Sequence, residues 1–145
     1  NGIQAIDLVT RKLPLSGGAA FRGWMDELRD IAEQIRRTNH PAFGDTAQRI
    51  EGALAAAQDA ADWLLTAMSE GRMVEALAGA TPFLRLVGLA SGGAYLGKAG
   101  LAEEKRAAMA RFFAENLLAE CESLRARVTD GAASLAAARS SLEDA

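Results

Sequence analysis

The stretch that decides the fold of this chain is residues 80–97, ATPFLRLVGLASGGAYLG. Pro82 removes one backbone donor and clashes with the preceding turn, so a helix arriving from Arg72 must kink or restart near Thr81. Beyond Pro82 the side chains are apolar nearly all round, and a helix without a polar face is buried on most of its sides. We therefore predict a helix ending near Ala99 that lies deep inside a helical bundle.

Glycines recur within this predicted helix at intervals of four residues. Gly88 is followed by Gly92, and Gly93 is followed by Gly97. A glycine in a helix interior costs about 1 kcal/mol relative to alanine, so four of them indicate a packing requirement. We predict that backbone packs against backbone here. The uncharged run between Arg85 and Lys98 is shorter than the roughly 20 apolar residues that a membrane span needs.

Apolar residues at alternating steps of three and four predict further helices on both sides of this one. The second helix spans about 19–38. The third begins between Pro41 and Asp45 and ends near Gly71, with Asp45 and Gln48 resembling a capping box. The fifth spans about 102–129 and ends at Thr129-Asp130-Gly131. The predicted inner faces are Phe21, Trp24, Leu28, Ile31 and Ile35; Phe43, Ala47, Ile50, Leu54, Ala57, Ala61, Leu64 and Met68; and Met109, Phe113, Leu117, Cys121, Leu124 and Val128.

The N-terminal residues are predicted to form the end of a leading helix. Ile3, Ile6, Val9 and Leu13 have helical spacing, and Pro14 with the glycines after it ends the segment. The sequence thus predicts an all-α fold, an up-and-down bundle of four long helices preceded by the end of another helix. The expected divisions are 1–18 for the leading helix end and linker, 19–131 for the bundle, and 132–145 for a weakly helical or frayed tail.

Composition and charge restrict the possible functions. The net charge is −3 with basic and acidic residues interspersed, so no basic stripe is available for nucleic acid. The single cysteine, Cys121, excludes an internal disulfide framework and a cysteine-based zinc cluster, and no leader segment is recognisable. We expect a cytoplasmic protein that neither binds nucleic acid nor spans a membrane.

No catalytic or metal-binding constellation is recognisable in the residues. His40 stands alone in a turn, and Cys121 lies on the inner face of a helix with no group to lower its pKa. The glycine-rich stretch 91–100 lacks the Gly-Lys-Ser/Thr ending and the preceding strand of a phosphate loop. The carboxylates fall mostly on outer helix faces, as on an ordinary solvated surface. The residues alone predict a packing or assembly module without catalytic residues or metal ligands.

A resemblance to a known family adds to this interpretation. Residues 1–13, NGIQAIDLVTRKL, resemble the start of the last core helix of acyl-CoA dehydrogenases, where Tyr-Glu-Gly-Thr runs into x-x-Ile-Gln. Residues 80–89, followed by Gly92-Gly93, resemble the Ala-Thr/Val-Pro-Phe/Tyr-Leu-Arg-Leu-x-Gly-Leu pattern of the extra C-terminal helical domain in one subgroup of these flavoenzymes. Residues 110–118, ARFFAENLL, are similar to its Ala-Arg-Phe-Tyr-Ala-Glu-x-Leu-Leu.

The resemblance implies a flavoprotein oxidoreductase of fatty acid metabolism in the full-length protein, with FAD as cofactor and acyl-CoA as substrate. It places the glutamate that takes the α-proton just upstream of Asn1, while a hydride passes to the flavin. It also implies that Asn1 and Gly2, together with Gln4, contact FAD. The bundle itself is expected to be non-catalytic and to pack on the dehydrogenase core or on a neighbouring subunit of a homo-oligomer. The alternative is an autonomous helical interaction module with no enzyme attached.

Overall fold

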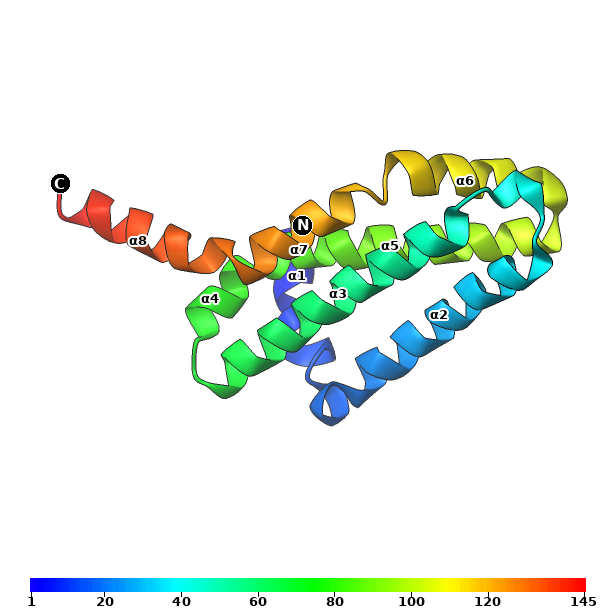
Figure 1. Ribbon diagram of the computed structural model, residues 1–145. Coiled ribbons are helices and arrows are strands. Elements are labelled where there is room, and N and C mark those ends of the chain that lie inside the picture. The colour runs from blue at the N-terminus through cyan, green and yellow to red at the C-terminus, as the bar shows by residue number, and fades with distance from the viewer.

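The computed structural model describes all residues from Asn1 to Ala145 and contains helices but no strand (Figure 1). The all-α fold predicted from the sequence is confirmed. None of the helices combines the length with the apolar character needed to cross a membrane. The elements are α1 (Gly2–Asp7), the π-helix η1 (Leu8–Lys12), η2 (Leu15–Gly18), α2 (Ala19–Thr38), η3 (Pro41–Phe43), α3 (Thr46–Ser69), α4 (Met73–Ala78), α5 (Ala80–Ala102), η4 (Glu104–Arg106), α6 (Ala107–Asn116), α7 (Glu120–Thr129) and α8 (Gly131–Glu143).

Helix α5 is the centre of the bundle, as its apolar sequence predicts. It packs against α2, α3, α6 and α7, and α1 also lies against it. The expected restart falls at Gly79, where α4 ends and α5 begins. Pro82 therefore occupies the first turn of α5, where a missing backbone N–H breaks no helical hydrogen bond. Tyr95 is the one large apolar residue of α5 that is exposed, and its hydroxyl accepts a hydrogen bond from Trp24 Nε1 at 3.0 Å.

The glycines of α5 have two different environments. A Cβ added at Gly97 would lie 2.5 Å from Ile35 Cδ1, and one at Gly93 would lie 2.9 Å from Leu118 Cδ1. These two glycines do permit close packing, but their partners are the ends of side chains rather than backbone. Gly88, in contrast, has nothing within 4 Å of its Cβ position, so the packing role predicted for it is wrong.

Helices α2 and α3 match the predicted faces and boundaries closely. The apolar seam of α3 is buried from Phe43 to Leu64. Helix α3 ends in a Schellman motif, in which the left-handed Gly71 (φ 78°) lets Arg72 N–H bond to Ala67 O at 2.8 Å. The capping box at its other end is wrong, because Asp45 makes no capping hydrogen bond and instead accepts from Arg49 Nε at 2.8 Å.

Ion pairs on the outer surface connect the helices of the bundle. Their members lie at the rims of helix contacts, with side chains roughly one quarter to three fifths exposed, so they fix register more than they add stability. The pairs are Arg36 with Glu51 between α2 and α3, Arg85 with Glu120 between α5 and α7, and Arg125 with Asp59 between α7 and α3.

The last long helix of the predicted bundle is broken. Helices α6 and α7 are separated at residues 117–119, where Leu118 N–H bonds back to Phe113 O at 3.3 Å instead of continuing the α-helical ladder. The break shifts the buried face of α6 from the predicted Met109 to Ala107, Ala110 and Ala114, whose small side chains allow close approach. Met109 is left 59% exposed, whereas the face predicted for α7 is correct.

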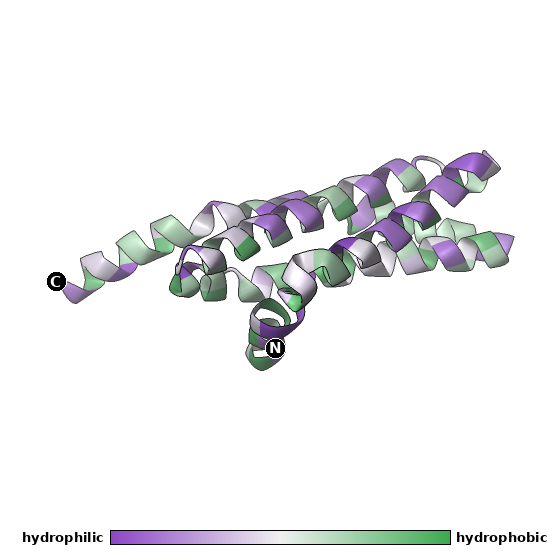
Figure 2. Ribbon diagram, turned by 90° about the horizontal axis from the view of Figure 1, so that it is seen from below, coloured by the Kyte–Doolittle hydropathy of each residue, from purple (hydrophilic) through white to green (hydrophobic).

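The two ends of the chain differ from the bundle between them. In the N-terminal segment Ala5, Val9 and Leu13 are buried, and the wide π turn keeps these four-residue steps on one face. Ile3 and Ile6, which have helical spacing with Val9 and Leu13 in the sequence, are both exposed. At the other end, α8 continues beyond the bundle as an arm (Figures 1 and 2). One continuous core of 34 buried side chains includes the N-terminal segment but none from α8.

Candidate functional site

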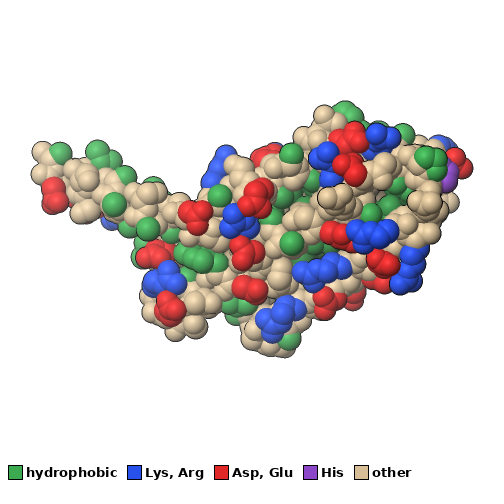
Figure 3. Space-filling model, viewed as in Figure 1, with side chains coloured by type: hydrophobic (Ala, Val, Ile, Leu, Met, Phe, Trp, Pro, Cys, Tyr) green, Lys and Arg blue, Asp and Glu red, His purple; other side chains and the backbone are tan.

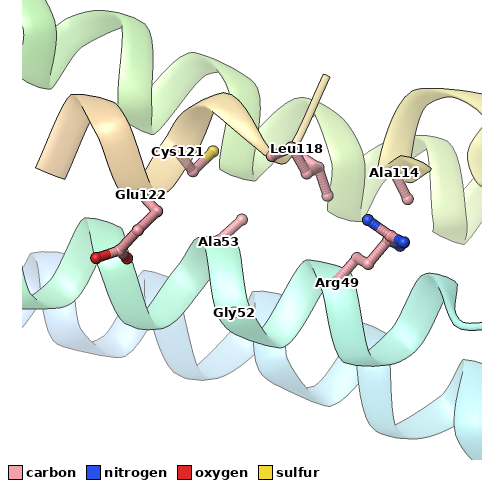
Figure 4. Close-up of a pocket in the computed structure, with 8 residues that line it drawn as sticks. Arg49, Gly52, Ala53, Ala114, Leu118, Cys121 and Glu122 are labelled. Atoms are coloured by element: carbon pink, nitrogen blue, oxygen red, sulfur yellow. The ribbon is translucent and has the colours of Figure 1, made fainter. Parts of the chain in front are cut away.

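A pocket lies between α3 and the break that separates α6 from α7 (Figure 4). It exists because the chain turns at 117–119 and leaves space beside the small residues of α3. Its volume is about 210 Å³ and its lining is mainly apolar. The lining residues are Arg49, Gly52, Ala53, Ala114, Leu118, Ala119, Cys121 and Glu122.

The reactive groups of this pocket are all occupied or inactive. The thiol of Cys121 is buried, and burial raises its pKa to about 11, with the charge of Glu120 adding to the rise and Arg85 opposing it. A thiol with this pKa stays protonated near neutral pH and is a poor nucleophile. The two charges at the pocket are paired elsewhere, Arg49 with Asp45 and Glu122 with Arg125, and the pair holds the pKa of Glu122 below its usual value.

His40 lies at the far end of the bundle and is held by two contacts. Its Nδ1 accepts a hydrogen bond from Ala42 N–H at 3.1 Å, and its Nε2 lies 3.1 Å from Glu104 Oε1. This arrangement caps the short helix η3 and joins it to η4. No group of three or more His, Cys, Asp or Glu residues is arranged to hold a metal ion. The glycine-rich stretch 91–100 is regular helix within α5 and not a phosphate loop.

The residues expected to contact FAD lie together at the exposed start of α1. Asn1 is the N-cap, and its Oδ1 accepts from Gln4 N–H at 3.3 Å. Nothing lies within 4 Å of the Cβ position of Gly2, and the carboxamide of Gln4 makes no hydrogen bond within the chain. These groups fit one edge of a polar cofactor, because they are open to approach and can donate and accept. They form no enclosure, so most of a flavin site would have to come from other polypeptide.

Exposed apolar side chains gather on surfaces that the sequence pattern did not single out. On the leading helix Ile3 is 83% exposed and Ile6 is half exposed. A groove of about 530 Å³ also lies between α8 and the junction of α4 with α5. Leu135 and Leu142 are seven residues apart, which would place them on one face of a helix. The tail was expected to be only weakly helical, so this spacing did not predict an apolar surface.

The fold defines a class of protein, a helical bundle domain with exposed apolar side chains on its first and last helices. Its sequence matches the family described as acetyl-CoA dehydrogenase C-terminal like over residues 24–139, which is most of the chain. The chain therefore belongs to this family of acyl-CoA dehydrogenase C-terminal domains. The family that the resemblance suggested is confirmed by this match, which includes residues 80–93 and 110–118.

The alignment with a curated relative covers a larger share of the chain. The chain is 32% identical over 146 residues to the 3-methylmercaptopropionyl-CoA dehydrogenase of Ruegeria pomeroyi (strain ATCC 700808 / DSM 15171 / DSS-3). The alignment covers 92% of this chain but 24% of that protein, so the chain spans about a quarter of the length of the relative. No solved structure matches the chain.

Proposed function

We propose that this chain is the C-terminal domain of an FAD-dependent acyl-CoA dehydrogenase and that it acts by packing, without supplying a catalytic residue. The observation that carries the proposal is the two-sided apolar character of α1. Its inner side buries Ala5 against the bundle, while its outer side presents Ile3 and Ile6. A short helix that is apolar on both sides is typical of a segment sandwiched between two bodies. The second body, we infer, is the rest of the dehydrogenase.

The predicted seam of α3 is not available for such docking. Its side chains from Phe43 to Leu64 are already covered within the bundle. The glycine-patched helix α5 is likewise largely occupied, because Gly93 and Gly97 receive side chains of neighbouring helices. The sequence suggested α3 and α5 as the surfaces that dock on the dehydrogenase. We propose the outer side of α1 instead.

The proposal includes the cofactor and the reaction. FAD would supply the hydride acceptor for α,β-dehydrogenation of an acyl-CoA thioester. The contribution of this chain would be binding and orientation, with the Gln4 carboxamide and the backbone at Gly2 contacting one edge of the cofactor. We further propose a cytoplasmic homo-oligomer. The Ruegeria pomeroyi relative is by name a dehydrogenase of a CoA thioester, which supports this reaction class.

The test uses both the 145-residue chain and a dehydrogenase that contains it. The isolated chain should be colourless and should not reduce a dye with acyl-CoA; a yellow, active chain would contradict the packing role. In the longer enzyme, the double substitution Ile3→Glu and Ile6→Glu should lower FAD content and activity. The control Leu15→Glu, which also replaces an exposed apolar side chain, should change neither. The same changes should leave the unfolding free energy of the isolated chain within about 0.5 kcal/mol. Unchanged flavin content in the double variant would exclude docking through α1.

The cofactor contact has its own test. Gln4→Ala in the longer enzyme should weaken FAD binding, because an amide that is free within the chain would lose its ligand. Lys12→Ala, an exposed change on the next turns of the same segment, should leave FAD affinity unchanged. Equal FAD dissociation constants for the wild type and Gln4→Ala would remove Gln4 from the site.

A further inference from the structure

The pocket beside the break between α6 and α7 has an interior without charge. Gly52 and Ala53 of α3 line it together with Ala114 of α6 and Ala119 of the break, and their side chains are too short to fill the space between the helices. The remaining volume is about 210 Å³. An engineered apolar cavity of about 150 Å³ in another protein binds benzene, so this pocket has room for a short hydrocarbon group.

The two ends of the pocket carry opposite charges. Figure 4 shows the Arg49 side chain reaching from α3 toward α6 at one end, and the Glu122 side chain reaching from α7 toward α3 at the other. Arg49 donates one hydrogen bond, from Nε to Asp45, so the two terminal nitrogens of its guanidinium make no hydrogen bond within the chain. Glu122 accepts from Arg125 and is 70% exposed. The cationic end of the pocket therefore has unused donors.

These unused donors define the ligand that the pocket fits. The planar terminal nitrogens of a guanidinium match the two oxygens of a carboxylate, and such charge-assisted hydrogen bonds are stronger than neutral ones. Glu122 disfavours a second negative charge at the other end, so the tail of the ligand should be uncharged. Figure 3 shows basic and acidic side chains interspersed over this side of the bundle, which leaves Arg49 rather than a broad positive surface to select the anion.

We propose that this pocket binds a short-chain monocarboxylate, with the carboxylate on the terminal nitrogens of Arg49 and the hydrocarbon tail between Ala53 and Leu118. Cys121 lies buried at the wall of the pocket and offers the tail a neutral, polarisable surface. Binding of this kind forms no covalent bond and needs no other reactant. The site uses none of the residues proposed to contact FAD, so it does not depend on the proposed dehydrogenase function.

The first experiment is an NMR titration of the 145-residue chain, which has its own continuous core. Hexanoate should shift the signals of Ala53, Ala114 and Leu118 and bind with a dissociation constant on the order of 1 mM, as expected for a ligand with so few atoms. The signals of the exposed Leu135 on α8 should not move. Unshifted signals at the pocket, or equal shifts at Leu135, would overturn the proposal.

Two further ligands test which chemical groups are recognised. Hexan-1-ol has a tail of the same length without a carboxylate, and adipate has a second carboxylate at the far end. Both should bind about fivefold more weakly than hexanoate, because the first loses the ion pair with Arg49 and the second brings a charge toward Glu122. Equal affinity of hexan-1-ol would show that the carboxylate is not recognised, and equal affinity of adipate would rule out the proposed direction of the tail.

A variant without the guanidinium separates charge recognition from apolar burial. Arg49→Met should weaken hexanoate binding about fivefold and leave hexan-1-ol binding unchanged. Arg29→Met is the matched control, because Arg29 is also paired with an aspartate and its side chain is likewise 39% exposed. The same loss of affinity in both variants, or unchanged affinity in Arg49→Met, would refute the role of Arg49.

A variant that fills the pocket tests the position of the tail. A Cβ at Gly52 meets nothing within 4 Å, so Gly52→Leu puts a larger side chain at the pocket without a clash in the fold. It should abolish the binding of both hexanoate and hexan-1-ol with an unchanged helical circular dichroism spectrum. Gly23→Leu on α2, where the Cβ position is equally open, should bind both ligands like the wild type. Full hexanoate binding in Gly52→Leu would contradict a tail held in this pocket.

Discussion

Helices α5 and α8 both have few charged residues, but their environments are opposite. Helix α5 is surrounded by four helices and by the N-terminal segment, whereas α8 contributes no side chain to the continuous core. The difference follows from the large side chains, because α5 has Phe83, Leu86 and Val87 within its first turns and α8 has isolated leucines seven residues apart. Two helices with few charges can thus differ in burial. The helix with closely spaced large side chains is buried, and the helix with isolated leucines is exposed.

The largest effect should come from removing the aromatic ring at the base of α5. Phe83 is fully buried, and its ring centroid lies 5.9 Å from that of Phe21. Phe83→Ala should lower the free energy of unfolding by about 3–5 kcal/mol in urea titrations, because burial is lost and a cavity remains. Leu135→Ala on the arm, measured in dilute protein, should change it by less than about 0.5 kcal/mol. Equal effects at the two positions would remove the distinction between centre and arm.

The next effect compares two glycines within α5. Gly100→Ala places a Cβ 3.0 Å from the Cα of Ala107 and 2.9 Å from Phe43 Cε1, and the backbone cannot move aside cheaply. Overpacking of about 1–3 kcal/mol should exceed the gain in helix propensity, so this variant should be less stable. Gly88→Ala meets nothing within 4 Å and should be more stable by up to about 1 kcal/mol. The signs of the two changes in urea midpoint test the packing, and stabilisation by both would contradict it.

A smaller effect concerns thiol reactivity. Cys121 should resist a disulfide reagent at pH 8 and react once urea unfolds the chain, whereas Ser140→Cys on α8 should react at once. Because its folded pKa of about 11 exceeds the ordinary value of 9.0, the stability from this thiol is complete below pH 9 and is lost as pH rises through 11. The stability difference between wild type and Cys121→Ala should therefore narrow over this range. A difference that is constant from pH 8 to pH 11 would contradict the raised pKa.

The smallest effect concerns an exposed ion pair at the centre of the bundle. Arg85 hydrogen-bonds Glu120 and holds the pKa of Glu120 below its usual 4.5, so the pair contributes stability above that pH and loses it as pH falls. Glu120→Gln should flatten this part of the acid limb in urea titrations between pH 5 and pH 3. Glu143→Gln, which removes the pair on the arm, should leave the acid limb of the dilute chain unchanged. A larger change from Glu143→Gln than from Glu120→Gln would invert the comparison.

The sequence predicted those parts of the fold where one signal dominates. The restart of the helix was predicted from Pro82 and the end of α3 from Gly71, because these residues act through local backbone chemistry. The buried face of α3 was predicted from its long repeated apolar pattern. The break at 117–119 was missed, since no Gly or Pro marks it. Local spacing also could not show that Ile3 points outward, because the π turn that rotates the segment has no sequence signature.

The functional prediction came from family motifs rather than from chemistry in the residues. That Cys121 and His40 belong to no active site stays a prediction, in keeping with the burial of the thiol and the hydrogen bond that the imidazole accepts. The cofactor contacts at Asn1, Gly2 and Gln4 stay a prediction. The groove at α8 could not be predicted, because it depends on how α4 and α8 meet in space, and these elements are far apart in the sequence.

Amide hydrogen exchange of the 145-residue chain tests the central contrast most directly. Backbone amides of α5 should be strongly protected, because opening them requires unfolding of the core. Amides of α8 should exchange rapidly, because Ala132 is the one buried residue of this helix. Rapid exchange throughout α5, or protection of α8 equal to that of α5, would contradict the division into a supported centre and an unsupported arm.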